Sequence, residues 1–166
     1  MNKSKGILVL AQNNEKTSYV QQACLLALSL KHTNPDCKIS IVTDDSISAK
    51  YKNLFDNIIE IPWQDDAQDT EWKIQNRWKL YHCSPYEQTI VMDTDMLVLQ
   101  DISTWWDFLS NYELFFTTNV YTYRGKRVTG DYYRKAFVNN NLPNLYSGVH
   151  YFEKSDFALE FYTWLE

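Results

Sequence analysis

Residues 89–101 read TIVMDTDMLVLQD, an apolar run that is interrupted by two carboxylates one residue apart. Alternate side chains of a β-strand share one face, so Asp93 and Asp95 would point the same way if a strand continued through them. Two such charges about 4 Å apart repel by about 4 kcal/mol at an effective dielectric near 20. A divalent cation would offset that repulsion, because Mn²⁺ and Mg²⁺ prefer oxygen ligands. An alternative stays open, in which the strand ends at Asp93 and the acids cap a turn before the next helix.

Apolar runs and helical repeats alternate along the rest of the chain. Further strands are predicted at residues 6–12, 38–45, 57–62, 113–123 and 148–154. Helices are predicted after a Thr17 or Ser18 cap and at residues 47–55, 72–83, 102–109, 131–140 and 157–166. The alternation predicts an α/β fold with a mostly parallel sheet, and the lack of repeats or linkers predicts one domain over residues 1–166.

Polar side chains follow three of the predicted strands. They are the amides of residues 12–14, the acids Asp44 and Asp45, and the pair Asp93 and Asp95. In α/β sheets, ligands bind beyond the carboxyl ends of the strands. We therefore expect these three strand ends to line one crevice.

Composition excludes several classes of function. The net charge of −5 argues against a nucleic-acid-binding surface, which is usually basic. No segment approaches the roughly 20 apolar residues that span a bilayer. Cys24, Cys37 and Cys83 lack metal-type spacing and are interpreted as reduced thiols of a cytoplasmic protein. Self-association as a homo-oligomer stays open.

The segment IVMDTDMLVLQDI, residues 90–102, resembles the Asp-x-Asp strand of GT-A type nucleotide-sugar glycosyltransferases. It is most similar to glycosyltransferase family 8, which includes glycogenin and bacterial galactosyltransferases. Three longer stretches resemble the same family in the same order: LALSLKHTNPDCKISIVTDD (26–45), RWKLYHCSPYEQTIVMDTDMLVL (77–99) and LYSGVHYFEKSDFALEFY (145–162). The resemblance implies a GT-A fold, a Rossmann-like three-layer sandwich.

The resemblance also implies a reaction and a set of site residues. A hexosyltransferase would move a sugar from a UDP-sugar donor to a carbohydrate or glycan acceptor, with retention of configuration. Asp93 and Asp95 would ligate Mn²⁺, or Mg²⁺, that bridges the donor diphosphate, and Arg77 would contact the donor. The remaining implied donor-binding residues are Ala11, Gln12 and Asn13 beside the uridine, Tyr19 for base stacking, and Thr94. The resemblance assigns no catalytic nucleophile.

The chain also departs from the family pattern. The family's third metal ligand is a His in a His-x-x-Gly-x-x-Lys-Pro motif, whereas His32, His82 and His150 lie outside any such motif and are interpreted as surface or packing residues. Tyr146 stands where the family has Asn. We therefore expect a truncated or minimal relative.

Two other functions compete with this interpretation. One is a catalytically impaired nucleotide- or sugar-binding module of the same fold, which the missing His motif favours. The other is a haloacid-dehalogenase phosphatase, which also uses Asp-x-Asp after an apolar strand. The phosphatase is disfavoured because Leu97 occupies the expected Thr position and the pair lies in mid-chain.

Overall fold

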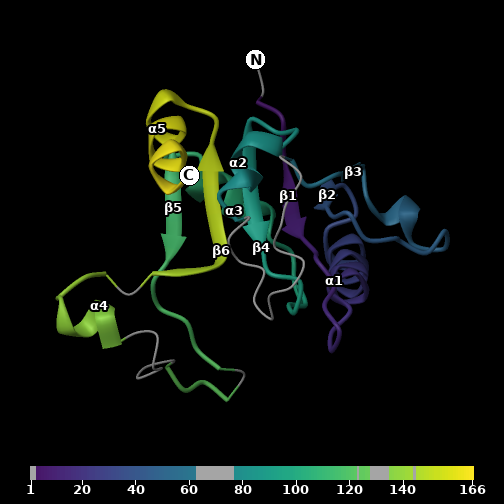
Figure 1. Cartoon of the computed structure of the whole chain (residues 1–166), viewed down its shortest axis with the longest axis horizontal. Helices are drawn as coiled ribbons and strands as arrows, with labels where there is room; N and C mark the ends of the chain where they lie inside the picture. The colour runs from purple at the N-terminus through teal and green to yellow at the C-terminus, as the bar shows by residue number, and fades with distance from the viewer. Residues whose placement is uncertain (1–2, 63–76, 123, 128–134, 144) are drawn as a thin grey trace.

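The computed structural model describes residues 3–62, 77–122, 124–127, 135–143 and 145–166. Within these ranges, six strands form one sheet in the order β3-β2-β1-β4-β6-β5 (Figure 1). The strands are β1 (Lys5–Leu10), β2 (Ile39–Val42), β3 (Asn57–Ile59), β4 (Gln88–Met92), β5 (Leu114–Thr117) and β6 (Tyr146–Glu153). Strands β3, β2, β1 and β4 are parallel to one another, and β6 runs antiparallel to both β4 and β5. The predicted α/β class with a mostly parallel sheet is confirmed.

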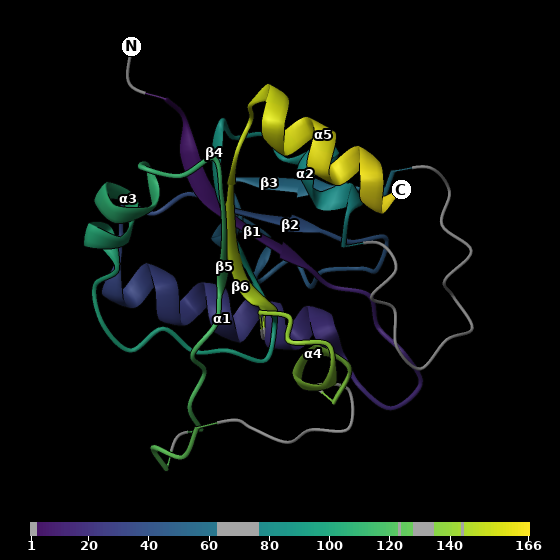
Figure 2. The same cartoon turned by 90° about the vertical axis from the view of Figure 1, so that its left-hand side faces the viewer.

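Helices cover both faces of this sheet, which gives three layers (Figure 2). The helices are α1 (Tyr19–Thr33), α2 (Lys79–Cys83), α3 (Ser103–Leu109), α4 (Lys135–Asn139), α5 (Asp156–Leu165) and the 3₁₀ turn η1 (Lys52–Leu54). α1 and α3 pack on one face, and α2 and α5 pack on the other. No helix in the described ranges is both long and apolar enough to cross a membrane.

The apolar run of β1 explains why both faces need a cover. Ile7 and Val9 point into the core beneath α1, while Leu8 between them points into the core beneath α2 and α5. All three side chains are fully buried. Each such side chain contributes about 1.5–3 kcal/mol when it leaves water, so an uncovered face would be costly.

α1 begins and ends where the sequence predicts. The Ser18 hydroxyl accepts a hydrogen bond from the backbone N–H of Gln21, and the N–H of Asn34 closes the last turn on the carbonyl of Leu30. Pro35 follows directly and cannot continue the helix. These two ends fix the position of Tyr19 at the first turn of α1.

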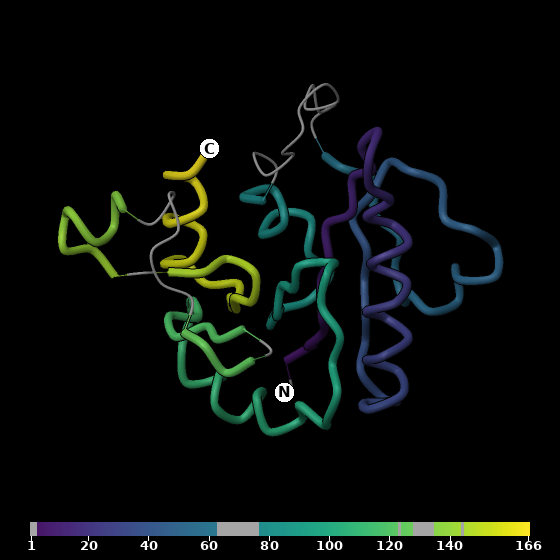
Figure 3. The backbone as a smooth tube through the Cα atoms, turned by 90° about the horizontal axis from the view of Figure 1, so that it is seen from below, coloured from purple at the N-terminus to yellow at the C-terminus, as the bar shows by residue number. Residues whose placement is uncertain are grey.

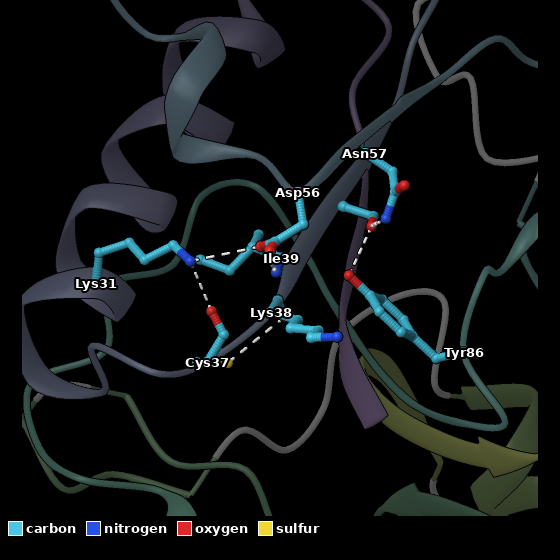
Figure 4. Close-up of polar contacts among 8 residues, drawn as sticks. Lys31, Cys37, Lys38, Ile39, Asp56, Asn57 and Tyr86 are labelled. Carbon is cyan, nitrogen blue, oxygen red and sulfur yellow. Dashed lines mark hydrogen bonds and ion pairs between the residues drawn. The ribbon is translucent and has the colours of Figure 1, made fainter. Parts of the chain in front are cut away.

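Polar contacts fasten the sheet at the edge where its parallel strands begin (Figure 4). Lys31 of α1 donates to the carbonyl of Cys37 at 2.7 Å and lies 3.4 Å from the Asp56 carboxylate. Asp56 also accepts from the N–H of Ile39 at 2.9 Å. Through this carboxylate, α1, β2 and the start of β3 are held together.

Tyr86 packs at the same edge, directly against β1. Its hydroxyl lies 2.7 Å from the Ser40 hydroxyl, which also accepts from Asn57 at 3.0 Å. The ring covers Gly6, where an added Cβ would come within 2.4 Å of the ring carbons. Glycine at position 6 is thus required by the close approach of an aromatic ring.

Some predicted elements are shorter in the structure. The predicted helix over residues 47–55 is wrong for most of its length, since only η1 forms, and a single turn without buried side chains is marginal. The predicted strand over residues 113–123 ends at Thr117, where β6 changes register. The predicted helices over residues 72–83 and 131–140 lie partly outside the described residues, and α2 and α4 account for the rest.

Candidate functional site

β4 ends at Met92, so both carboxylates of the Asp-x-Asp pair follow the strand. The N–H of Asp93 still donates to the carbonyl of Gly148 at 2.8 Å, which extends the pairing with β6 by one residue. The chain then turns. Thr94 is buried and its hydroxyl donates to the side chain of Gln22 on α1 at 3.0 Å, while Asp95 is exposed. The backbone thus follows the alternative in which the strand ends at the first acid, but among the described residues neither Asp93 nor Asp95 caps a turn or the next helix.

A guanidinium neutralises the first of the two acids. Arg77 forms an ion pair with Asp93, and the two side chains are 29% and 31% exposed. The other terminal nitrogen of Arg77 donates to the Ser147 carbonyl at 3.2 Å and to its hydroxyl at 3.3 Å. A positive partner for the carboxylate pair is thus present in the chain itself.

A bulge in β6 lies against these residues. The pairing of β5 with β6 changes register between Phe116 and Thr117, so that Thr117 pairs with Tyr146 and residues 147–149 have no partner on β5. The Thr117 hydroxyl donates to the carbonyls of Tyr146 and Val149 at 3.2 and 3.1 Å, which closes the base of the bulge.

The backbone of the bulge lies close to the Asp93 side chain at Gly148. A Cβ added at Gly148 would lie 3.0 Å from the Asp93 Oδ2 atom and 3.1 Å from the Met96 Cε atom. A side chain at position 148 would therefore displace the carboxylate or the methionine. Glycine here lets β6 approach the end of β4 closely.

Two hollows meet at the Asp-x-Asp turn. Figure 3 shows the backbone from this side, with α1 on the right. The first has a volume of about 180 Å³ and is lined by six of the residues predicted to bind the donor: Gln12, Tyr19, Arg77, Asp93, Thr94 and Asp95. The second has a volume of about 550 Å³. Asp93 and Asp95 line both hollows, and the second is completed by Asn119 and by residues 145–149, which include the bulge.

Two of the predicted donor residues have other positions. Ala11 is fully buried in the core beneath α1. Asn13 accepts from the N–H of Val20 at 3.0 Å through its side chain, and its own N–H donates to Asp45 at 2.6 Å. Neither lines the first hollow. Their contact with a uridine stays a prediction.

The acids after β2 serve neighbouring loops. Asp45 accepts from the N–H of Asn13, and Asp44 accepts from the N–H of Ile61 at 2.9 Å. Neither acid lines the two hollows. Of the three polar strand ends, those after β1 and β4 share a hollow, while the end of β2 ties the adjacent loops together.

The carboxylates fit a divalent cation that arrives with its own oxygen ligands. Among the described residues, no group of three or more His, Cys, Asp or Glu side chains could hold a metal ion. Asp95 is exposed and makes no hydrogen bond or ion pair within those residues, and Asp93 adds a second carboxylate. Mg²⁺ is commonly held by one or two carboxylates together with substrate phosphates, which matches this donor set.

His150 contacts the site, although the sequence indicates only a surface or packing residue at this position. It is buried on β6, stacks on Phe116 with ring centroids 5.2 Å apart, and places its Nδ1 atom 2.9 Å from the Ser147 carbonyl. Burial lowers the pKa of His150 to about 4, assisted by the Arg77 guanidinium and opposed by the hydrogen bond to Ser147. The sequence carries no signal for this contact, because it depends on the register change in β6.

Comparison with solved structures identifies the class of fold. The chain matches the glycosyltransferase GlyE of Streptococcus pneumoniae TIGR4 with a TM-score of 0.60 and 14% identity, over 95% of this chain and 36% of that one. It matches the galactosyltransferase LgtC, solved with donor and acceptor sugar analogs, with a TM-score of 0.57 and 18% identity, over 96% and 66%. It matches the mannosyltransferase Ktr4p of S. cerevisiae with a TM-score of 0.57 and 10% identity, over 98% and 60%.

The shared architecture is that of GT-A glycosyltransferases, and the predicted fold is confirmed. This chain spans less than two thirds of each of those three chains. No protein-family model matches the sequence, and no curated protein matches it. The resemblance to glycosyltransferase family 8 therefore stays a prediction.

Proposed function

We propose that this chain is the nucleotide-sugar-binding domain of a metal-dependent glycosyltransferase of family 8 type. It would transfer a sugar from a UDP-sugar to a carbohydrate or glycan acceptor, with retention of configuration. One observation carries the proposal: at the ligand edge of a GT-A fold, Arg77 is paired with Asp93 beside Asp95, which has no partner among the described residues. Gln12 and Tyr19 complete the same hollow.

The residues of the hollow suit the charge changes of sugar transfer. Transfer breaks the bond between the anomeric carbon and a diphosphate oxygen, and the bonding electrons remain on the departing UDP. Arg77 is permanently charged and presents several donors, so it can stabilise that developing charge. The acceptor hydroxyl forms the new bond to the anomeric carbon, and its proton passes to the departing diphosphate.

Asp93 and Asp95 are the residues that would hold Mn²⁺ or Mg²⁺. When bound, the cation supplies positive charge beside the diphosphate of the donor. Asp95 is the stronger candidate ligand within the described residues because it is exposed and unpaired, whereas Asp93 is shared with Arg77. The larger hollow on the other side of the pair has room for the donor sugar and part of the acceptor.

Thermal unfolding with UDP and Mn²⁺ tests the binding part of the proposal. A ligand present at 100 times its Kd stabilises the native state by about 2.7 kcal/mol, which raises the Tm of a protein of this size by roughly 5–10 °C. Asp95→Asn should remove most of that rise. Asp107→Asn is the matched control, because Asp107 is an exposed acid on α3 that lines neither hollow. No rise with any nucleoside diphosphate would refute the proposal.

A binding module without turnover is the second candidate function. The observation in its favour is that the described residues supply two carboxylates and no third metal-ligating side chain beside them. Hydrolysis of UDP-sugars separates the two candidates. Turnover above the buffer rate that disappears in Asp95→Asn supports the enzyme, whereas UDP binding without turnover on any tested sugar nucleotide supports the module.

A further inference from the structure

The Ser147 carbonyl accepts two hydrogen bonds within the β6 bulge. The Arg77 guanidinium donates one at 3.2 Å. The Nδ1 atom of His150 provides the other at 2.9 Å. The carbonyl oxygen therefore links a buried ring on β6 to the cation that faces Asp93.

The second bond fixes which nitrogen of His150 carries a proton. A carbonyl oxygen has no hydrogen to give, so Nδ1 must be the donor. Burial keeps the ring neutral at pH 7 by lowering its pKa to about 4. The neutral ring then has its proton on Nδ1, because each neutral imidazole carries only one N–H.

The His150 ring is held on its strand by packing as well as by this bond. It stacks on Phe116 of β5 with an interplanar angle of 16°, and Phe116 in turn lies 5.8 Å from the ring of Phe161 on α5. Phe116 and His150 are also the last regular pair before the register change. The ring thus stands on the ordered part of the ladder and reaches into the bulge.

We infer that His150 is a positioning residue for Arg77: by donating from Nδ1 to the Ser147 carbonyl, it fixes the bulge that orients the guanidinium at the donor hollow. Ser147 is the shared acceptor through which the ring acts, and His150 itself lines neither the first hollow nor the second. For its effect on substrate, the inference rests on the proposed function. Its structural part concerns Arg77 alone and does not need a nucleotide.

Three substitutions separate the hydrogen bond from the volume of the ring. In His150→Asn, the side-chain amide can place an N–H near the position of Nδ1, whereas in His150→Gln it reaches toward the position of Nε2, and His150→Leu has no donor. We expect the Asn variant to bind UDP with Mn²⁺ within about threefold of the wild type. The Gln and Leu variants should bind about tenfold more weakly, in line with the loss of one buried hydrogen bond.

Nitrogen NMR of the arginine and histidine side chains tests the same inference in the absence of nucleotide. The chain has four arginines and three histidines, which keeps their side-chain signals assignable. In the wild type and in His150→Asn, the Arg77 Nε–H signal should be that of an ordered side chain, and in the Gln and Leu variants it should resemble the signal of an exposed arginine. His32→Leu is the matched control, since His32 is exposed, and it should leave the Arg77 signal unchanged.

The tautomer of His150 can be measured in the wild-type protein, so this test does not depend on whether a variant folds. A proton on Nδ1 of His150 supports the inference, and a proton on Nε2 overturns it. An unchanged Arg77 signal in a folded His150→Leu protein also overturns it. A wild-type protein that binds no nucleoside diphosphate refutes the proposed function instead, because the NMR result on Arg77 stands independently of it.

Discussion

The guanidinium of Arg77 forms an ion pair with the carboxylate of Asp93, 16 residues further along the chain. The pair lies at the rim of the smaller hollow, where a divalent cation would need the same carboxylate. Under the proposed function, Arg77 and such a cation would compete for Asp93 until a diphosphate provided the guanidinium with another partner. The site would then take up metal and nucleotide more readily together than separately.

Replacing Arg77 by Met tests this competition. Without the guanidinium, Asp93 is free for a cation, so the affinity for Mn²⁺ alone should rise by roughly three- to fivefold, in the range of a partly exposed ion pair. The affinity for UDP should fall in the same variant. Calorimetric titration measures both. Lys38→Met removes the same charge from an exposed position at the opposite edge of the sheet and should change neither affinity.

Alanine at position 148 should weaken nucleotide binding with little loss of stability. Its Cβ would lie 3.0 Å from Asp93, which must shift by a few tenths of an ångström, while the Gly148 backbone does not have a positive φ. We expect UDP and Mn²⁺ to bind several-fold more weakly and the free energy of unfolding to fall by less than about 1 kcal/mol.

Gly125→Ala serves as the comparison for Gly148→Ala, because it should lower stability without weakening nucleotide binding. Gly125 has a φ of +69° and open space around its Cβ position. Alanine there should cost about 1 kcal/mol of stability and leave nucleotide binding intact. Equal binding loss in both glycine variants would contradict the steric explanation at Gly148.

Gly6→Ala should destabilise the protein by about 2–3 kcal/mol, because its Cβ would overlap the Tyr86 ring. Urea unfolding measures this cost. A double-mutant cycle identifies the cause: in a Tyr86→Ala background, the additional cost of Gly6→Ala should become small. If the two costs simply add, the clash with the ring is not the reason for glycine at this position.

Acid should destabilise the protein through His150. The folded pKa of about 4 lies below the ordinary value of 6.5, so the unfolded chain binds the proton more readily. The free energy of unfolding therefore falls as the pH drops from about 6.5 to 4, by up to roughly 3 kcal/mol from this group. Urea titrations of wild type and His150→Asn across this window isolate the contribution. Parallel pH profiles for the two proteins would contradict it.

Much of the fold follows from local patterns in the sequence. The apolar runs at β1 and β2 predict strands because a strand that is buried on both faces has apolar side chains at successive positions. Ser18 predicts the start of α1 because its hydroxyl accepts from a backbone N–H of the first turn. The predicted helix over residues 47–55 fails although Ile47 and Phe55 are buried in the core beneath α1. Burial of these two side chains does not require a helix between them, and the single turn η1 buries none of its own side chains.

The site could be predicted only in part. Asp93 and Asp95 stand out because two carboxylates follow an apolar strand, whereas Arg77 is implied only by the resemblance to family 8. The structure places all three at one hollow. The contacts of Ser147 and His150 arise from the bulge, and a register change between β5 and β6 has no local pattern that marks it. The positive partner of Asp93 was expected to be a metal, whereas the chain also supplies an arginine.

The antiparallel insertion of β6 between β4 and β5 has a consequence for the order of folding. Strands β1 to β4 are all synthesised before β6, so they can pair before β6 leaves the ribosome. The bulge at Gly148 reaches Asp93 only after the chain has been made through β6, and closing that long loop is entropically costly. A nascent chain thus acquires a sheet before it acquires a pocket, and binding competence arrives late in synthesis.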